Sequence, residues 1–543
     1  MGPIWAAART ILPVLLAAAL LSACTGGQEQ RGDRAPTSQT GSNGIIVAAI
    51  GEAVSFHPYK TTDTASSTYQ SLVYAGGLTT RDPDDVEHII PEMAESWEVS
   101  PDGRTYTFKL RPDLVWSDGV PLTAYDFKWT YDQASKPENG YPYISNMEPI
   151  ESYEAVDDRT LVVTLKEALA VGLEQADAAV QMPLPKHIWE KYDWNDPSQN
   201  PEILHPTVGS GPFLLQSWTR DERAVFVANP RYFKGRPKLD SYTIRIAGTP
   251  QVAYQWLRAG EVDVSSFPPE NYAEAKQLPN VTVYEWWPAT GNWSYIGFNL
   301  TTPALQDVRV RRALAHAINR DAIIERVMFN LARPIDSAYG PSCWCYNPDV
   351  PKREYNPDRA RQLLEEAGWQ LGPDGIRVKD GQRLQLRLIY GPNTSRVRTA
   401  IAQVTQEAFK QVGVGVEIIQ LEWGAYLARQ RDPSAWDLAV AGWRATIEPH
   451  WMYQIWSEEN IPELNAGSYR NPQVEALFKQ AAREFDQATR KQLYGEIQRI
   501  LAEDQPYIFL FQDKSYTGVN NRIGGIRPTA LGIDYNLHEW YIK

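Results

Sequence analysis

The first 300 residues carry mostly short apolar runs and alternating apolar and polar positions, a pattern that predicts strands. The continuous apolar run 45–50 predicts the first of them. Residues 105–110 alternate with a period of two after the turn tripeptide Pro101-Asp102-Gly103, and residues 160–165 repeat this arrangement after Asp157-Asp158. We therefore expect this half of the chain to consist mainly of strands joined by tight turns.

After residue 300 the apolar positions recur at helical spacing instead. Asp307 is suited to cap the start of one such stretch, and Pro357 suits the first turn of another. The expected helices cover residues 308–318, 360–367, 404–412 and 473–502, with a strand at 414–419 between them. Helices that alternate with a strand predict an α/β domain in this half.

The N-terminus has the pattern of an export signal. Residues 12–21 form an apolar run behind a single cation, shorter than the ~20 residues that span a bilayer. This predicts a signal peptide over 1–23, with an uncleaved membrane helix as the alternative. Leu21-Ser22-Ala23-Cys24 resembles a bacterial lipobox, in which Cys24 would carry the lipid, unless the Cys is incidental. Residues 24–44 are rich in Gly, Ser, Thr and Gln, which predicts a flexible tether.

The balance of charges excludes two classes of partner. The chain has 53 Lys and Arg residues against 66 Asp and Glu, a formal net charge of −13. A nucleic-acid-binding protein needs a basic surface, and a protein held by anionic lipid would also be basic. We therefore expect no nucleic-acid partner and no charge-driven membrane contact. The 543 residues suffice for about three domains, and 43% hydrophobic residues exclude wholesale disorder.

Residues that could do metal or catalytic chemistry are few. Cys343 and Cys345 flank Trp344 and could form either a disulfide or two free buried thiols, but two thiols alone make a poor zinc site. The seven His residues show no ligand spacing, and the common motifs of metalloproteases, P-loops, hydrolase nucleophiles and dinucleotide sites are absent. We expect no metal, no cofactor and no catalytic residues. A hydrolase with two carboxylates stays an alternative, because 66 acidic residues allow many pairs in a fold.

Two long segments carry the most specific pattern. Residues 91–111 contain Pro91-Glu92-Met93-Ala94-Glu95-Ser96-Trp97, and residues 116–126 begin with Trp116-Ser117-Asp118-Gly119. Together they closely resemble the signature of the family 5 extracellular solute-binding proteins, the oligopeptide- and dipeptide-binding components of ABC importers. The likeness continues through residues 208–213, 229–233, 257–263, 298–300, 307–314 and 363–369.

The resemblance implies a mixed α/β fold of the periplasmic-binding-protein type, with three domains in two lobes and a ligand cleft between the lobes. Domain I would be discontinuous, made of residues 45–76, 206–306 and 507–543. Domain II, residues 77–205, would be inserted in the first lobe, and domain III, residues 307–506, would form the second lobe. A ligand that contacts both lobes would favour the closed form.

The function implied is that of a receptor rather than an enzyme. It would bind an extracytoplasmic peptide and deliver it to ABC permease subunits, which work with cytoplasmic ATPases. Some family members bind oligosaccharides, so an oligosaccharide or another uncharged solute is the alternative cargo. We expect a monomer, lipid-anchored to the outer face of the cell membrane, in the periplasmic space if an outer membrane exists.

The family also implies ligand-binding residues by position. The matching positions are Glu52, Val54, Trp293, Tyr295, Trp423, Trp443 and Thr446. Peptide-binding relatives carry an Asp where this chain has Thr446, and that Asp pairs with the α-ammonium of the peptide. Thr offers no charge to neutralise a buried cation, so Glu448 or Glu52 could substitute.

Several of these positions have a second interpretation. Glu448 could cap the turn before Pro449, and Trp423 and Trp443 could be ordinary core residues. The missing Asp and the 19 Trp residues favour an uncharged ligand such as a sugar, whereas the commonest role of the family favours a peptide. Both cargo classes therefore stay open at this point.

Overall fold

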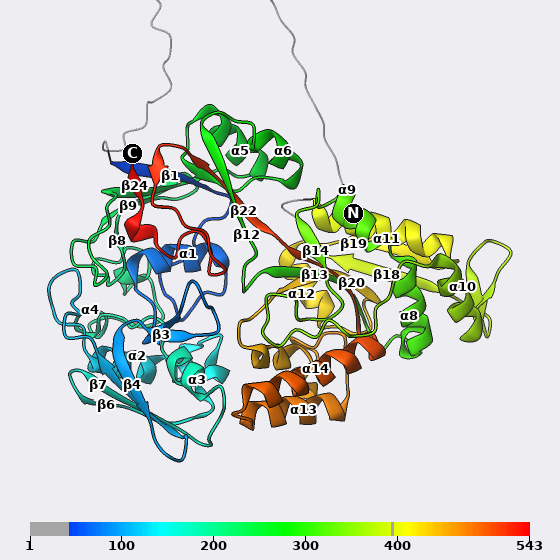
Figure 1. Ribbon diagram of the computed structural model, residues 1–543, viewed down its shortest axis with the longest axis horizontal. Coiled ribbons are helices and arrows are strands. Elements are labelled where there is room, and N and C mark those ends of the chain that lie inside the picture. The colour runs from blue at the N-terminus through cyan, green and yellow to red at the C-terminus, as the bar shows by residue number, and fades with distance from the viewer. Residues whose placement is uncertain (1–42, 392–395) are drawn as a thin grey trace, which may run out of the picture. The chain divides into compact units, whose positions relative to one another are not determined.

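The strands predicted for the first half build two separate sheets in the computed structural model, which describes residues 43–391 and 396–543 (Figure 1). The predicted signal peptide 1–23 and Cys24 lie outside these residues, as does nearly all of the predicted tether 24–44. None of the helices in the described ranges combines the length and apolar character needed to cross a bilayer.

The first sheet combines strands from the beginning, the middle and the end of the chain. Its seven strands lie in the order β12 (Val281–Trp286), β22 (Ser515–Asn520), β11 (Val264–Ser265), β1 (Gly44–Ala49), β10 (Ser241–Ile246), β9 (Arg223–Ala228) and β8 (Phe213–Thr219). The predicted first strand is confirmed as β1, which pairs in parallel with β10 and places Ile45 opposite Tyr242. Helices α1 (Thr64–Val73), α5 (Pro250–Ala259) and α6 (Tyr272–Ala275) accompany this sheet.

The second sheet is antiparallel and contains the two predicted alternating segments. Its order is β4 (Ala94–Val99), β5 (Thr105–Leu110), β7 (Thr160–Leu165) and β6 (Ile150–Asp157). The prediction is confirmed for β5 and β7, whose successive residues alternate between a buried, mainly apolar face and a more exposed one. Around it lie β2 (Thr79–Arg81), β3 (Ile89–Pro91), α2 (Ala124–Ala134), α3 (Gly172–Ala178) and α4 (Lys186–Trp189).

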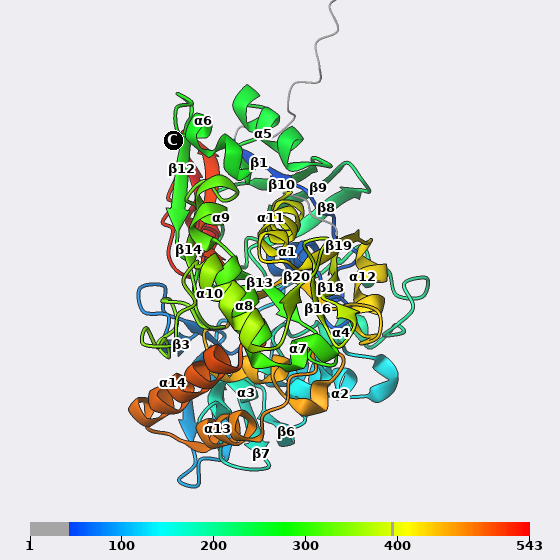
Figure 2. The same ribbon diagram turned by 90° about the vertical axis from the view of Figure 1, so that its right-hand side faces the viewer.

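The third sheet has six strands and is surrounded by the helices of the second half. The strand order is β14 (Ala332–Pro334), β21 (Tyr507–Asp513), β13 (Asn292–Phe298), β20 (Leu438–Arg444), β18 (Gln385–Tyr390) and β19 (Gly415–Gln420). The helices are α7 (Pro303–Gln306), α8 (Val308–Ala317), α9 (Arg320–Arg326), α10 (Pro357–Glu366), α11 (Val397–Gln411), α12 (Trp423–Gln430), α13 (Pro472–Arg483) and α14 (Gln487–Asp504) (Figure 2).

The expectation of one helix over residues 473–502 is wrong, because the segment forms two helices, α13 and α14. The Asp486 carboxylate accepts a hydrogen bond from the Thr489 N–H at 2.8 Å and so caps the start of α14. An N-cap residue has an extended backbone, which interrupts the helical path.

The remaining regular segments are short. They are β15 (Gln370–Leu371), β16 (Arg377–Lys379), β17 (Gln382–Arg383), β23 (Ile523–Gly524), β24 (Tyr541–Ile542), and the 3₁₀ turns η1 (Pro137–Asn139), η2 (Ile144–Met147), η3 (Pro201–Ile203), η4 (Pro269–Asn271), η5 (Pro449–Ile455), η6 (Glu458–Asn460) and η7 (Leu537–Glu539).

Two chain segments cross between the seven-stranded and the six-stranded sheet. The chain passes from β12 to β13 through residues 287–291, and it passes from β21 to β22 through Lys514 alone. The side chains of the first two sheets share one apolar core, which includes Phe108 and Phe226. The six-stranded sheet has separate cores, one with α8 and α10 and one with α13 and α14. The two crossing segments therefore connect bodies that are each packed internally.

Candidate functional site

A cavity of about 480 Å³ lies where the seven-stranded and six-stranded sheets are connected. The segments that follow β1 and β11 contribute Ile50 and Phe267, strands β13 and β20 contribute Trp293 and Trp443, and the end of β21 and the crossing contribute Asp513 and Lys514. Its volume falls within the range of about 300–1,000 Å³ that is usual for small-molecule sites. Because both sheets and the crossing segment supply its wall, a bound molecule would contact both bodies at once.

Two of the sequence-predicted residues, Trp293 and Trp443, form one part of this wall. Antiparallel pairing of β13 with β20 sets them directly opposite each other, so both side chains lie on the same face of the sheet. Trp293 is 1% exposed and packs against Tyr295 and Phe509, with ring centroids 5.3 and 5.8 Å away. Trp443 is only partly buried. The pair supplies a large, rigid apolar surface.

Tyr295 lies behind this wall. Its ring stacks on Tyr507 with centroids 4.1 Å apart and planes inclined by 10°. Full burial raises the pKa of the Tyr295 hydroxyl well above its usual value. Tyr295 therefore supports Trp293 from the core side and does not line the cavity.

Glu52 and Val54 follow β1 and also lie outside the cavity lining. The Glu52 carboxylate accepts hydrogen bonds from Trp218 Nε1 at 2.8 Å and from the Asp221 N–H at 3.1 Å. The Arg220 guanidinium stacks 3.6 Å above the Trp218 ring. Val54 is 63% exposed. The Glu52 carboxylate is thus engaged within its own sheet region.

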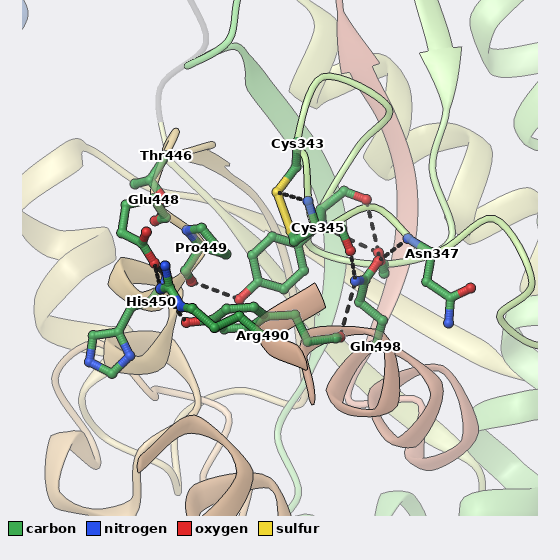
Figure 3. Close-up of a disulfide and its surroundings, with 12 residues drawn as sticks. Cys343, Cys345, Asn347, Thr446, Glu448, Pro449, His450, Arg490 and Gln498 are labelled. Carbon is green, nitrogen blue, oxygen red and sulfur yellow. Dashed lines mark hydrogen bonds and ion pairs between the residues drawn. A yellow bond between two sulfur atoms is a disulfide. The ribbon is translucent and has the colours of Figure 1, made fainter. Parts of the chain in front are cut away.

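Thr446 and Glu448 lie in the loop after β20, where Glu448 caps η5 (Figure 3). Thr446 Oγ1 donates to the Glu448 carbonyl at 2.8 Å. Glu448 Oε1 accepts from the His450 N–H at 2.9 Å and forms an ion pair of 2.6 Å with Arg490 on α14. Both partners of the pair are buried, so the charge of Glu448 is already neutralised inside the protein.

The two cysteines beside this loop are joined by a disulfide, which decides between the two alternatives for Cys343 and Cys345 (Figure 3). Gln498 Nε2 donates to the Cys345 carbonyl at 2.8 Å, and the Arg490 guanidinium lies 5.2 Å from the centre of the Trp344 ring. These contacts fix the disulfide loop to α14. Within the described residues, no group of three or more His, Cys, Asp or Glu side chains is arranged to hold a metal ion.

Trp423 begins α12 and does not line the cavity, although it lies close to a residue that does. It is 50% exposed and stacks on Tyr426, with ring centroids 5.5 Å apart. The guanidinium of Arg398, a cavity residue, lies 5.9 Å from the Trp423 ring. Trp423 is therefore neither an ordinary core residue nor part of the cavity lining.

Sequence reasoning missed the charged residues of the cavity wall, among them Arg398, Arg444, Asp513 and Lys514. One signal was present, since Asp513 ends the otherwise mostly apolar strand β21 and a second charged residue, Lys514, follows it directly. Burial raises the pKa of Asp513 to about 7, and its Oδ1 atom has no hydrogen-bond partner among the described residues.

Lys514 instead forms an ion pair with Glu285, which also pairs with Lys276 at 3.0 Å. Partial burial opposes ionisation of Glu285, but hydrogen bonds from Lys514, Tyr272 and Lys276 lower its pKa to about 2. Lys514 and Glu285 thus neutralise each other, whereas no ion pair joins the neighbouring Asp513 to a cation in the described part of the chain.

Two internally packed bodies, two crossing segments and a cavity between the sheets define the class of two-lobed solute-binding proteins. The chain belongs to the bacterial extracellular solute-binding proteins, family 5, whose middle-region model matches residues 88–461, more than half of the chain. The family resemblance and the expected fold class are therefore confirmed.

Individual relatives extend the match over the remaining residues. The chain is 30% identical over 548 residues to the oligopeptide-binding protein AppA of Bacillus subtilis (strain 168), covering 98% of each. It is 29% identical over 480 residues to the dipeptide-binding protein of Escherichia coli (strain K12), covering 82% of this chain and 84% of that one. The solved structure of AppA with a nonapeptide superimposes with a TM-score of 0.80 at 29% identity, covering 92% of this chain and 99% of that chain.

Proposed function

We propose that this protein is the substrate-binding receptor of an ABC importer, which captures an extracytoplasmic peptide between two closing lobes and delivers it to a membrane permease. The observation that carries the proposal is the 480 Å³ cavity between the sheets, with Trp293 and Trp443 on its wall. Two relatives are named as an oligopeptide-binding and a dipeptide-binding protein, which supports a peptide as the cargo. The relatives named above favour a peptide over the oligosaccharide that the missing Asp and the 19 Trp residues left open, and none of them is named as a hydrolase.

The lobes of this mechanism correspond to the three-domain division expected from the family. Residues 45–76, 206–306 and 507–543 would move with 77–205 as one lobe, and residues 307–506 would form the other. The crossings β12–β13 and β21–β22 are suited to act as the hinge, because few residues there need to change conformation. A peptide that contacts both lobes then stabilises the closed form.

The test of this function is recovery of bound cargo. Purified protein is incubated with a library of unmodified peptides, and the species retained after rapid gel filtration are identified by mass spectrometry. We expect intact peptides from the wild type and few from Trp443→Ala. Cleaved products would show an enzyme instead, and a library eluting entirely unbound would contradict a peptide receptor.

We further propose that the receptor is a monomer anchored to the outer face of the cell membrane by lipid on Cys24. The lipobox-like Leu21-Ser22-Ala23-Cys24 supports this anchor. Cys24→Ser is expected to release the protein from the membrane fraction and to remove the mass of the acyl chains. A variant that stays in the membrane fraction with unchanged mass would contradict lipidation at this residue.

A further inference from the structure

Asp513 stands at the point where β21 leaves the six-stranded sheet and the chain crosses to the seven-stranded sheet. It lines the cavity, and its Oδ1 atom is buried without a hydrogen-bond partner among the described residues. An unpaired buried carboxylate oxygen is costly, because the interior does not replace the hydrogen bonds that water would give it. A carboxylate that lines a binding cavity and finds no partner for this oxygen among the described residues indicates a partner that arrives with the ligand.

The other charged and titratable groups of the wall are engaged elsewhere. Lys514 pairs with Glu285, and Arg444 donates to the Thr290 carbonyl at 3.1 Å and to Thr290 Oγ1 at 3.2 Å. Tyr516 donates its hydroxyl to the Phe267 carbonyl at 3.1 Å.

The remaining cation of the wall, Arg398, lies 5.9 Å from the Trp423 ring. Burial is the cause of the raised pKa of Asp513, and no cation among the described residues offsets it. The groups around Asp513 therefore leave its carboxylate in need of a positively charged donor.

The sequence led us to expect that Glu448 or Glu52 would pair with a positively charged group of the ligand, but neither carboxylate is available for it. Glu448 is paired with Arg490, and Glu52 accepts from Trp218 and Asp221. Both also lie outside the cavity lining. Asp513, by contrast, lines the cavity, and its Oδ1 atom has no hydrogen-bond partner among the described residues.

We propose that Asp513 binds a protonated primary amine of the cargo and thereby selects for cargo that carries one. This proposal rests on the proposed function and specifies which chemical group of the peptide the cavity recognises. A primary ammonium carries three N–H donors and a full positive charge, so it forms a strong charge-assisted hydrogen bond with a carboxylate. The amine is either the α-ammonium or a lysine ε-ammonium, since the two share this chemistry.

The experiment uses three matched peptide pools that lack Arg and His, each covering four to nine residues. The first pool has free amino termini and no Lys, the second is N-acetylated without Lys, and the third is N-acetylated with one Lys. Each pool is mixed in equal amounts with the wild type, with Asp513→Asn and with Asp358→Asn, and retained peptides are quantified by mass spectrometry. Asp358 is a matched charge control, because its side chain is 92% exposed on α10, outside the cavity lining.

For the wild type and Asp358→Asn we expect amine-bearing peptides to be enriched at least tenfold over the acetylated Lys-free pool. Enrichment of the first pool would assign the α-ammonium, and enrichment of the third would assign the lysine side chain. In Asp513→Asn the enrichment should fall to about onefold, while binding of the acetylated Lys-free peptides persists. Melting temperatures of all three proteins establish that they are folded.

Three results would overturn the proposal, and they are distinguishable. If Asp513→Asn keeps the enrichment of the wild type, a group other than Asp513 binds the amine. If the wild type retains acetylated Lys-free peptides as well as amine-bearing ones, the amine site is wrong and the peptide receptor stands. If the wild type retains none of the pools, the proposed function falls and the amine site falls with it. If Asp513→Asn is unfolded, Asp513→Ser takes its place, because the pools on the wild type test the preference for an amine but not the residue that binds it.

Discussion

At the scale of single residues, Trp293 and Trp443 are neighbours on one wall but differ in burial. Trp293 is 1% exposed, so Trp293→Ala should lower the free energy of unfolding by about 3–5 kcal/mol. Trp443 is partly buried and borders the cavity, so Trp443→Ala should cost less than half of that and should abolish peptide binding. Urea unfolding and peptide-induced changes in fluorescence measure the two effects. Equal losses of stability in both variants would assign Trp443 to the core.

His57 is a residue whose protonation should affect stability. Its ring is buried between Trp189 and Trp194, with centroids 5.0 and 4.6 Å away. Nδ1 accepts from the Tyr59 N–H at 3.2 Å, so Nε2 carries the proton and donates to the Trp194 carbonyl at 3.1 Å. Burial, aided by the charge of Lys60, lowers the pKa of His57 to about 3.

The consequence is a loss of stability in acid. Below about pH 6.5 the unfolded chain protonates His57 while the folded protein does not, down to about pH 3. Stability from this group is therefore complete above pH 6.5 and decreases as the pH falls, by about 3 kcal/mol at pH 4.5. His57→Gln is expected to be less stable at pH 7.5, and its deficit should shrink by about that amount at pH 4.5. Urea unfolding at both pH values checks this, and a constant deficit would contradict it.

How far the site could be predicted depends on the kind of information each residue needs. Trp443 was expected at the site because its motif is local in sequence, and Trp293 because it precedes Phe298-Asn299-Leu300. Both line the cavity, and their contact with a ligand stays a prediction. Asp513 was missed because the burial of its carboxylate depends on segments far away in the chain. Local sequence indicates which residues can contact a ligand, whereas unpaired groups become visible only in the fold.

At the scale of elements, the Glu448–Arg490 pair fixes η5 to α14. Removing one member of a buried ion pair leaves the other charge uncompensated, so Glu448→Gln should cost about 3–5 kcal/mol of unfolding free energy. The double variant Glu448→Gln/Arg490→Met should lose less than the sum of the single losses. Glu458→Gln is the matched control, because its pair with Arg470 is more than half exposed and should contribute under about 1 kcal/mol. Additive losses would show that the pair is not coupled.

The positions of the strands and helices along the chain were predicted better than the pairing of the strands with one another. Period-two alternation gave β5 and β7 nearly to the residue, because alternation reflects one buried face. The break between α13 and α14 was missed, although Asp486 is a good capping residue. The pairing of β13 with β20 was not predictable, since it joins segments separated by more than a hundred residues and depends on register.

At the scale of the whole molecule, a second contact joins the two bodies away from the cavity. The Ala170 N–H donates to the Ala482 carbonyl at 2.8 Å, and Arg483 pairs with Glu167 at 2.9 Å. Ala170 and Glu167 lie between β7 and α3, whereas Ala482 and Arg483 end α13 (Figures 1 and 2). The two bodies therefore also touch at an exposed polar contact outside the cavity lining.

Reversing one charge of the Arg483–Glu167 pair should shift the conformational equilibrium toward a form in which the two bodies lie further apart. Arg483→Glu places two like charges at an exposed contact, so we expect peptide affinity to fall about two- to fivefold with little change in melting temperature. Small-angle X-ray scattering should show a larger radius of gyration without peptide. Lys491→Glu on α14 makes the same charge change and is exposed, so it serves as the control. Equal effects of both variants would attribute the shift to net charge alone.

The position of β22 has a consequence for how the protein is made. This strand lies between β11 and β12, yet it is synthesised near the end of the chain, whereas β1 of the same sheet comes first. At the usual rate of translation the two are separated by half a minute or more, on the order of the time taken to make the whole chain. From the synthesis of β12, about midway through that interval, until that of β22, strands β11 and β12 keep the edges that β22 will cover, and uncovered edges promote association with other chains. The sheet that starts first is thus completed last, and the newborn chain is exposed to aggregation until its final residues are made.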